Sequence, residues 1–235
     1  MIGVLGGMGP LATVDFFAKV VAASKASSDE GHVPLLIHSD PRLPSRPAAI
    51  LHHGESPLPA LMAARDRLIV AGAVALAMPC NTAHYWYDAL VADCPVPFLS
   101  IVTASVEQVR KRARPGDRVA ILGTRATLES RLFARPLRDA GFTLLLPDEH
   151  VLATQILPSI LQVKQGKVKE AGAMLDRVVK DLLDRGASQV VLACTEIPLA
   201  LAAVQSPHAA VCIDTNDALA RACVAWWEEW ASPAA

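Results

Sequence analysis

Short apolar runs alternate with longer amphipathic stretches along the whole chain. The apolar runs are rich in Ala, Leu and β-branched residues and are bounded by Gly, Pro or polar residues, so they predict β-strands. The longer stretches, such as 56–71, 166–185 and 214–231, predict helices. Because strands and helices alternate, the pattern predicts an α/β fold of parallel strands with helices on both faces. The expected strands are 2–6, 33–38, 73–78, 97–99, 118–123, 142–146, 188–193 and 210–213.

The pattern occurs twice along the chain. The segment "LIVAGAVALAMPCNT" at 68–82 matches "LLDRGASQVVLACTE" at 182–196, and "GVLGGMGPLATVDFF" at 3–17 matches "AILGTRATLESRLF" at 120–133. Any two strand–turn–helix units share some likeness, but the matched cysteines and glycines go beyond an apolar pattern. A repeat of about half the chain predicts two similar lobes. In the first pair of segments, the matched residues are all 114 positions apart: Leu68 and Leu182, Gly72 and Gly186, and Cys80 and Cys194.

The final strand and helix, 210–231, follow the second copy of the repeat. They either complete the second lobe or cross back to the first, and the residues alone leave both arrangements open.

Composition narrows the class of protein. The chain has 235 residues, of which 52% are hydrophobic and 19% charged, which is typical of a globular protein with one large domain or two small ones. The net charge is −1 and no Lys/Arg block occurs, so we expect neither nucleic acid nor a membrane as partner. The start "MIGVLGGMGP" lacks the basic segment of a signal peptide. The charge-free run 68–87 contains Pro79 and Asn81, which favours a buried strand and turn over a membrane span.

The five cysteines are odd in number and scattered, which argues against a disulfide framework and favours the reducing cytoplasm. Two of them, Cys80 and Cys194, lie where an expected parallel strand ends and a helix begins. Ligand sites of open α/β sheets collect at such strand ends, and the free N–H groups of a helix N-terminus favour a thiolate or a bound carboxylate. Two lobes related by the repeat would therefore place one thiol on each side of a cleft.

Two thiols across a cleft are what a two-base racemase needs. One thiolate removes the proton from a stereocentre, and the opposite thiol returns a proton to the other face. No cofactor motif occurs in the sequence, so we expect no cofactor. A lysine that binds pyridoxal phosphate is not recognisable from sequence alone. Cys80 and His84 have the spacing of a metal-binding pair, but no second pair of that kind occurs, so a packing role for His84 is favoured and no metal is expected.

Several motifs together resemble the cofactor-independent aspartate/glutamate (hydantoin) racemase superfamily, nearest its aspartate racemase branch. The resemblance covers nearly the whole chain and implies a two-lobed α/β fold, an active site between the lobes and a homodimer. It also implies that the last strand and helix return to the first lobe, so that residues 1–98 and 209–235 form one lobe and 99–208 the other. The motifs are "GVLGGMGP", "MPCNTAH", "KQG", "ACTEIPL" and "IDTND".

The resemblance also implies roles for single residues. Cys80 and Cys194 match the two acid/base cysteines, and in related glutamate racemases the first serves the D-enantiomer and the second the L-enantiomer. Arg46 and Lys164 match two cations that hold the side-chain carboxylate of the substrate. The remaining candidate binding residues are Met8, Asn81, Thr82, Thr195 and Glu196; the last follows "CT", where an acid complements the helix dipole or orients its neighbours.

One motif departs from the branch. Arg46 lies between Ser45 and Pro47, whereas the branch has an acidic residue before this arginine and a threonine after it. Proline removes a backbone donor and restricts Arg46 toward extended geometry. Two cations suit a dicarboxylate, because a bidentate Arg and a point-charge Lys hold its far end. Racemisation of aspartate, or else glutamate, is therefore the expected reaction. Maleate cis–trans isomerisation, hydantoin racemisation and a non-catalytic dicarboxylate-binding protein remain as alternatives.

Overall fold

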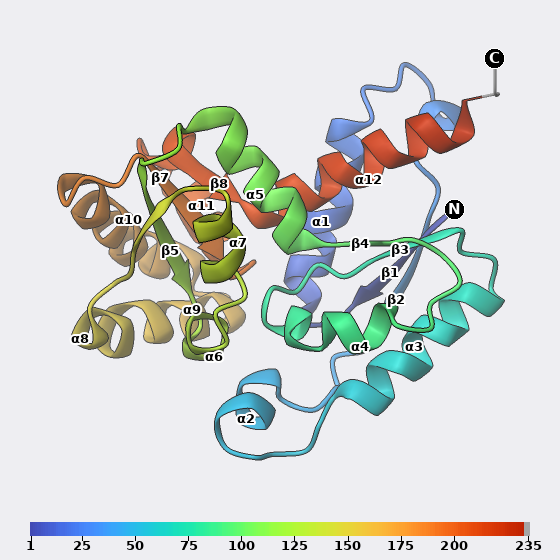
Figure 1. Cartoon of the computed structure of the whole chain (residues 1–235), viewed down its shortest axis with the longest axis horizontal. Coiled ribbons are helices and arrows are strands. Elements are labelled where there is room, and N and C mark those ends of the chain that lie inside the picture. Colours follow the sequence, from blue (N-terminus) through green and yellow to red (C-terminus); the bar gives the residue numbers. More distant parts are fainter. Residues whose placement is uncertain (233–235) are drawn as a thin grey trace.

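The computed structural model describes residues 1–232, which form two lobes lying side by side (Figure 1). Each lobe contains a four-stranded parallel sheet, and the two sheets have the same strand order, β2-β1-β3-β4 and β6-β5-β7-β8. The strands are β1 (Ile2–Gly6), β2 (Leu35–Ser39), β3 (Ala75–Ala77), β4 (Phe98–Leu99), β5 (Arg118–Gly123), β6 (Thr143–Leu145), β7 (Gln189–Ala193) and β8 (Cys212–Asp214).

Helices cover both faces of each sheet, as expected for parallel strands that are buried on both sides. They are α1 (Pro10–Ala23), α2 (Arg46–Leu51), α3 (Leu58–Val70), α4 (Tyr87–Val91), α5 (Ile101–Arg112), α6 (Arg125–Glu129), α7 (Ala134–Asp139), α8 (Glu149–Val151), α9 (Leu157–Lys164), α10 (Val168–Asp184), α11 (Ile197–Ala203) and α12 (Thr215–Ala231). A π-helical segment, Leu152–Ile156, joins α8 to α9.

The fold confirms the two similar lobes that the repeat predicts. β1 and β5 take the second place in their sheets, and β3 and β7 take the third, so the two repeated segment pairs occupy equivalent positions. Every residue of β1, β3 and β7 is buried. Central strands covered on both faces are almost entirely apolar, with Gln189 at the start of β7 as the exception, so they form nearly continuous apolar runs in the sequence.

The final strand corrects the expected lobe boundary. β8 pairs with β7 and completes the second sheet, so the part of the range 209–235 that includes β8 does not return to the first lobe. The helix that follows does return, because α12 packs along α1 (Figure 1). The main-chain donors of β8 need partners, which the open edge of β7 supplies, whereas α12 needs only an apolar surface.

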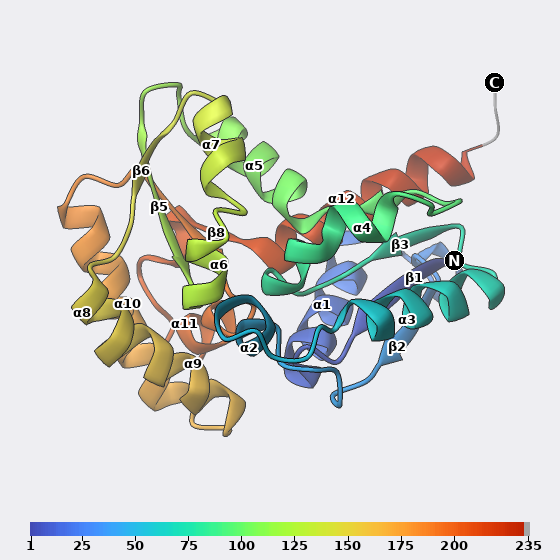
Figure 2. The ribbon, with the colours of Figure 1, turned by 60° about the horizontal axis from the view of Figure 1, so that its bottom comes forward.

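A shared apolar core joins the lobes. It contains Phe16 of α1, Ile101 of α5, Ile121 of β5 and Leu219 of α12, all nearly or completely inaccessible to solvent. Two further cores lie on the other faces of the sheets, one in each lobe. The lobes are therefore packed together along α1, α5 and α12, and α2 lies against α6 of the second lobe on another side of the molecule (Figure 2).

A partly buried ion group joins the start of α12 to α1 at the lobe junction. The ammonium of Lys19 lies 2.5 Å from Asp15 Oδ2 and 2.6 Å from Asp214 Oδ2, and Asn216 Nδ2 donates to Asp15 Oδ2 at 2.8 Å. Burial by itself would lower the pKa of Lys19, but the charges of Asp214 and Asp15 outweigh it and the pKa is raised. One cation is thus shared by carboxylates from both lobes.

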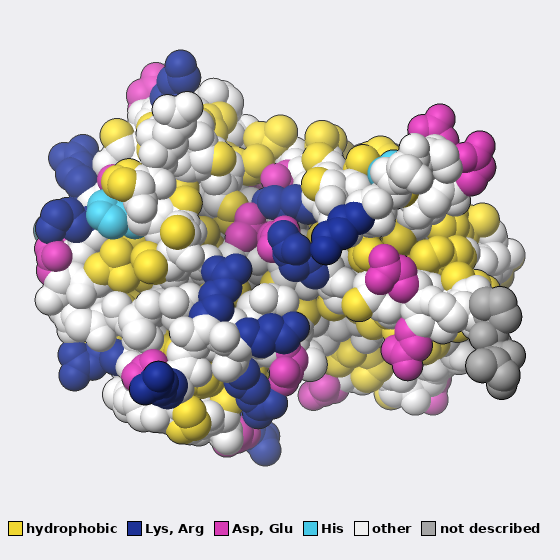
Figure 3. Space-filling model, turned by 90° about the horizontal axis from the view of Figure 1, so that it is seen from above, with side chains coloured by type: hydrophobic (Ala, Val, Ile, Leu, Met, Phe, Trp, Pro, Cys, Tyr) yellow, Lys and Arg dark blue, Asp and Glu magenta, His cyan; other side chains and the backbone are white. Residues whose placement is uncertain are grey.

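The outer surface between α5 and α12 contains charged side chains of both signs. Seen from above, side chains of both charge signs intermingle around the groove between α5 and α12, which Glu107, Lys111, Arg221 and Glu228 help to line (Figure 3). Within residues 1–232, no helix is both long enough and apolar enough to cross a membrane.

We predict that Lys19→Met destabilises the protein by about 3 kcal/mol, because it leaves two partly buried carboxylates without their cation. Lys180→Met is the matched control, because Lys180 pairs with Asp184 at 2.5 Å on an exposed helix face. Such exposed pairs contribute up to about 1 kcal/mol. Urea unfolding of both variants measures the difference, and equal losses of stability would contradict a special role for Lys19.

Candidate active site

The two cysteines of the repeat lie at equivalent strand ends. Cys194 follows directly after β7, and Cys80 lies three residues after β3. Both are buried, with 5% of Cys80 and 6% of Cys194 exposed, and both line one cavity between the lobes. A short 3-10 helix, Thr82–Trp86, follows Cys80, and α11 follows Cys194. Each sulfur therefore lies beside the start of a helical segment, as the sequence predicts.

All nine residues that the sequence singled out line this cavity. The first lobe also contributes Pro47, and the second contributes Thr124, which sequence reasoning missed. The cavity is narrow, with a volume of about 30 Å³. Larger grooves lie on the outside of the molecule. The nine residues are Met8, Arg46, Cys80, Asn81, Thr82, Lys164, Cys194, Thr195 and Glu196.

Glycine in the first turn brings two chain segments together at the cavity. Gly7 has a φ of 90°, and a Cβ on it would lie 2.5 Å from the main chain of Asp40. Only glycine adopts this conformation without strain and leaves room for the neighbouring strand end. The segment after β2, which leads to Arg46, can therefore pass directly against the turn that carries Met8.

Cys194 is hydrogen-bonded to a buried carboxylate. Its thiol donates to Glu196 Oε2 at 3.1 Å, and the Thr195 hydroxyl donates to the same oxygen at 3.3 Å. Lys164 Nζ lies 3.8 Å from Glu196 Oε1. Burial, followed by the charge of Glu196 and its hydrogen bond, raises the pKa of Cys194 well above that of an ordinary thiol, while the charge of Lys164 opposes the shift. Cys194 is therefore held as a thiol.

Cys80 has a different electrostatic environment. Burial raises its pKa too, but the strongest opposing influence is the positive charge of Arg46, and Lys164 acts in the same direction. The pKa of Cys194 is driven up more strongly, because only that sulfur has a carboxylate as a hydrogen-bond acceptor. Of the two thiols, Cys80 is the easier to ionise.

The conformation of Arg46 differs from the sequence expectation. Arg46 is the first residue of α2, not extended, because Pro47 occupies the first turn, where a missing N–H costs nothing. Ser45 caps the helix, since its side chain accepts from Ala48 N at 3.3 Å. The Arg46 guanidinium donates from Nη1 to the carbonyls of Leu43 and Pro44 at 3.1 and 2.9 Å. No residue of α2 is buried.

Hydroxyl and amide groups connect the lobes beside the thiols. Thr82 Oγ1 lies 2.8 Å from Thr127 Oγ1 and 3.2 Å from Thr124 Oγ1, both in the second lobe. Asn81 Nδ2 donates to Thr215 Oγ1 at 2.9 Å. Asn81 Oδ1 is buried and has no hydrogen-bond partner among residues 1–232. Thr124 follows β5 where Gly7 follows β1, so the repeat itself was the signal that could have found it.

His84 has a structural role. Its Nδ1 lies 2.8 Å from the carbonyl of Cys80, and its Nε2 accepts from the N–H of Ile101 at 3.1 Å, so both ring nitrogens are engaged. Burial lowers the pKa of His84 to about 4. The neutral ring joins the main chain at Cys80 to the first turn of α5. Within the described residues, no group of three His, Cys, Asp or Glu side chains is placed to hold a metal ion.

Residues 5–223 match the family model described as Asp/Glu/Hydantoin racemase. The chain belongs to this racemase family. The structure is similar to that of the aspartate racemase of Picrophilus torridus, with a TM-score of 0.84 and 30% identity over 96% of this chain and 93% of the other. The sequence is 28% identical to the broad specificity amino-acid racemase RacX of Bacillus subtilis (strain 168), over 95% of this chain and 96% of that protein.

Glutamate racemases are also similar to this chain. That of Pseudomonas aeruginosa (strain UCBPP-PA14) is 31% identical over 165 residues, which cover 66% of this chain and 58% of that protein. The chain is thus an amino-acid racemase of the Asp/Glu racemase family, and so an isomerase.

We predict that His84→Gln removes a pH dependence of stability. The pKa of His84 in the folded protein, about 4, lies below the ordinary 6.5, so the unfolded chain takes up the proton first as the pH falls. The neutral buried ring thus stabilises the fold above pH 6.5, and about 3 kcal/mol of this is lost between pH 6.5 and 4. Urea unfolding of His84→Gln should show a shallower loss over this range.

His52→Gln, at an exposed position, is the control and should keep the wild-type slope. A wild-type slope in His84→Gln would contradict the burial of a neutral ring.

Proposed function

We propose that this racemase interconverts L- and D-aspartate, and glutamate as a second substrate, without a cofactor. The observation that carries the proposal is one cavity lined by two cysteines from equivalent strand ends together with two cations, Arg46 and Lys164. The aspartate racemase of Picrophilus torridus supports the choice of substrate.

The reaction needs one thiolate and one thiol on opposite faces of the α-carbon. The thiolate takes the α-proton, its bonding pair stays on the substrate as a carbanion stabilised by the carboxylate, and the second thiol donates its proton to the other face. The two sulfurs exchange protonation states in each turnover. No oxidant or reductant is consumed, and the product differs from the substrate only in configuration.

The two environments support different roles for the thiols. Cys194 donates to Glu196 and suits the acid, whereas Cys80, next to the charge of Arg46, is the thiol that ionises more easily to become the base. By resemblance to glutamate racemases, the first cysteine acts on the D-enantiomer, so the form with its thiolate on Cys80 acts on the D-substrate. After that turnover, a proton must return to Cys194 before a second D-molecule can react.

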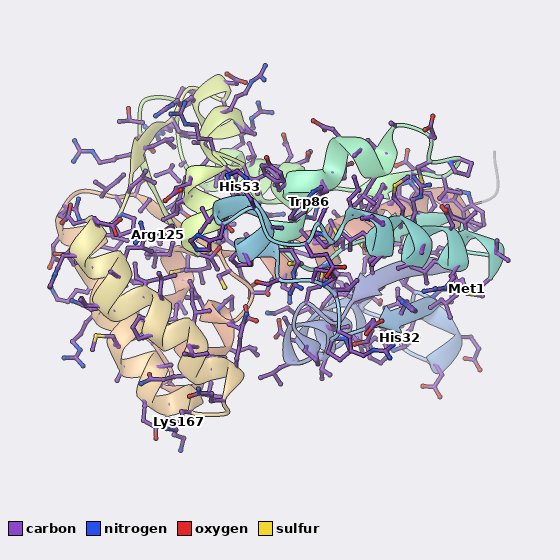
Figure 4. The ribbon with its side chains drawn as sticks, turned by 90° about the horizontal axis from the view of Figure 1, so that it is seen from below. Met1, His32, His53, Trp86, Arg125 and Lys167 are labelled. Atoms are coloured by element: carbon purple, nitrogen blue, oxygen red, sulfur yellow. The ribbon has the colours of Figure 1, made fainter. Side chains whose placement is uncertain are left out.

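The polar groups of the cavity suit a dicarboxylate with an ammonium group. Arg46 and Lys164 provide two positive charges for carboxylates. The buried Asn81 Oδ1 lacks a partner among residues 1–232 and suits the substrate ammonium as a donor. The cavity is narrow, and we expect α2, which buries no side chain, or a whole lobe to move outward when a substrate binds. Figure 4 shows His53, just beyond α2, near the second lobe.

A broader amino-acid range is the second candidate. It is favoured by the similarity to the broad specificity racemase RacX and by Glu196, whose charge offsets that of Lys164 in the cavity. Maleate isomerisation, hydantoin racemisation and dicarboxylate binding without turnover are outcomes that the assay below separates. All five cysteines are unpaired, which supports a reducing compartment, and we propose the cytoplasm.

The first test is proton NMR in deuterium oxide without added pyridoxal phosphate. We expect the α-proton signal of L- and D-aspartate to disappear while optical rotation decays to zero. Cys80→Ser and Cys194→Ser should each lower racemisation at least about 1,000-fold, because a serine hydroxyl is a far weaker acid. Cys94→Ser, which replaces a cysteine outside the cavity, is the control and should retain activity.

Other results would change the assignment. Undiminished racemisation by Cys80→Ser would rule out the two-thiol reaction. Exchange with many amino acids but none preferred would favour the broad-specificity candidate, and conversion of maleate or a hydantoin alone would favour those reactions. Aspartate binding that survives replacement of both cysteines by alanine, with no turnover by the parent protein, would indicate a binding protein.

We predict that Glu196→Gln shifts the pH profile of kcat/KM to lower pH. The charge of Glu196 raises the pKa of both thiols, so its removal lets the first thiolate form at lower pH. The shift should be equal for the two enantiomers, because they have the same free energy. Glu149→Gln, an exposed substitution outside the cavity, should leave the profile unchanged. A lower rate with no shift would contradict electrostatic control of the thiols by Glu196.

A further inference from the structure

A groove on the second lobe combines arginines with apolar side chains. It is lined by residues of α6, α7, β6 and the segment that leads from β6 into α8, and its volume is about 490 Å³. This volume is within the range of small-molecule sites in proteins. The groove shares no lining residue with the cavity between the lobes, although the two are neighbours: Thr124, which caps α6, lines the cavity, and Arg125, the next residue, lines the groove.

Positive charge exceeds negative charge in this groove. Arg125, labelled in Figure 4, binds both acids of the lining: its Nη1 donates to Glu149 Oε2 at 2.9 Å and lies 3.6 Å from Glu129 Oε1. The two acids are therefore already engaged within the protein, and the other two arginines are left over. The charged residues of the lining are Arg125, Glu129, Arg131, Arg138 and Glu149.

The two remaining arginines have no acidic partner. Neither Arg131 nor Arg138 forms an ion pair with a carboxylate among residues 1–232, whereas Arg135 of the same region pairs with Asp139 at 3.7 Å. Arg138 lies in the last turn of α7, and Arg131 lies between α6 and α7 with a φ of 57°, which residues with a side chain seldom adopt. A guanidinium without an acidic partner can bind an added anion without first breaking an ion pair.

The rest of the lining is largely apolar. Leu144 belongs to β6, the edge strand of the second sheet, and Leu146 follows that strand. Leu146 is 43% exposed, and Leu128 of α6 is only partly buried. A ligand with an apolar part would therefore remove these side chains from water while its anionic part lies at the arginines.

We propose that this groove binds a phosphate monoester of an aromatic or other apolar group. Arg131 and Arg138 hold the phosphate, because a guanidinium donates in pairs to phosphate oxygens and a dianion suits two positive charges. The apolar group lies against Leu128, Leu144 and Leu146. The ligand is thus chemically different from the acidic amino acids proposed for the cavity.

Other ligands fit this groove less well. Inorganic phosphate leaves the leucines in water, and a neutral apolar molecule leaves both free guanidiniums without an anion. Nucleic acid is bound through extended basic surfaces, whereas Glu129 and Glu149 lie among the arginines here and would repel neighbouring phosphates of a strand.

Isothermal titration of the purified full chain with phenyl phosphate tests the proposal, with inorganic phosphate and phenol as comparisons. We expect phenyl phosphate to bind with a Kd of about 0.1–1 mM, at least about 10-fold more tightly than either comparison. Arg131→Gln and Arg138→Gln should each weaken its binding at least about 10-fold, because each removes charge-assisted hydrogen bonds. Arg135→Gln, on the same helix as Arg138 but outside the groove, is the matched control and should bind as the wild type does.

Two further variants locate the bound ligand. Leu146→Ser should weaken the binding of phenyl phosphate about 5-fold and leave that of inorganic phosphate unchanged, because only the ring contacts this side chain. Arg46→Gln should leave the binding of phenyl phosphate unchanged, because Arg46 lines the cavity and not the groove. Circular dichroism melting should show that all variants stay folded.

Three results would overturn the proposal. The first is a wild type that does not bind phenyl phosphate at about 10 mM. The second is binding that Arg46→Gln abolishes while Arg131→Gln retains it, since the ligand would then lie in the cavity. The third is equal affinity for phenyl phosphate and inorganic phosphate, since the leucines would then contribute nothing to recognition.

Discussion

One partly buried ammonium group, that of Lys19, joins the two lobes beside their shared apolar core. Asp214 ends β8 in the second sheet and caps α12, because its side chain accepts from the main-chain N–H groups of Asn216 and Asp217. Asp15 lies on α1 of the first lobe. Lys19 lies between the two carboxylates, and so fixes the point at which the chain leaves one lobe and packs on the other.

This geometry brings the carboxyl ends of two parallel sheets to a common cavity. Met8, Cys80, Thr124 and Cys194 follow β1, β3, β5 and β7, and each lines it. At the carboxyl end of either sheet lie helix N-termini and polar turns, whose main-chain N–H groups are free to bind a ligand. Because the two sheets face each other, such groups lie on both sides of the cavity.

The two lobes are similar in fold, but the surroundings of their two cavity thiols differ in electrostatics. Glu196 accepts a hydrogen bond from Cys194 and opposes its ionisation, whereas Arg46 favours the ionisation of Cys80. A two-base reaction requires one thiol and one thiolate, and two neighbouring thiols pass through this state because loss of the first proton disfavours loss of the second. Unequal neighbours favour the thiolate on one sulfur, here Cys80.

Much of the fold and site could be predicted because their signals are local. A buried parallel strand is apolar along most of its length, and the expected strands agree with β1 to β8 to within two residues at each end. A cysteine directly after such a strand is placed by that strand alone. The repeat then predicts that a second cysteine takes the equivalent place, and both line the cavity.

By itself, then, the sequence determined the class of fold, its internal repeat and the residues at the strand ends, since periodicity and short motifs depend on near neighbours. Only the tertiary structure decided that β8 pairs with β7 while α12 crosses to α1, and that Thr124 meets Thr82 across the lobes. It also decided that Arg131 and Arg138 line one groove of the second lobe. Hydrogen bonds and packing between residues far apart in the chain depend on which surfaces pack against each other. A local pattern of apolar and polar positions does not determine this.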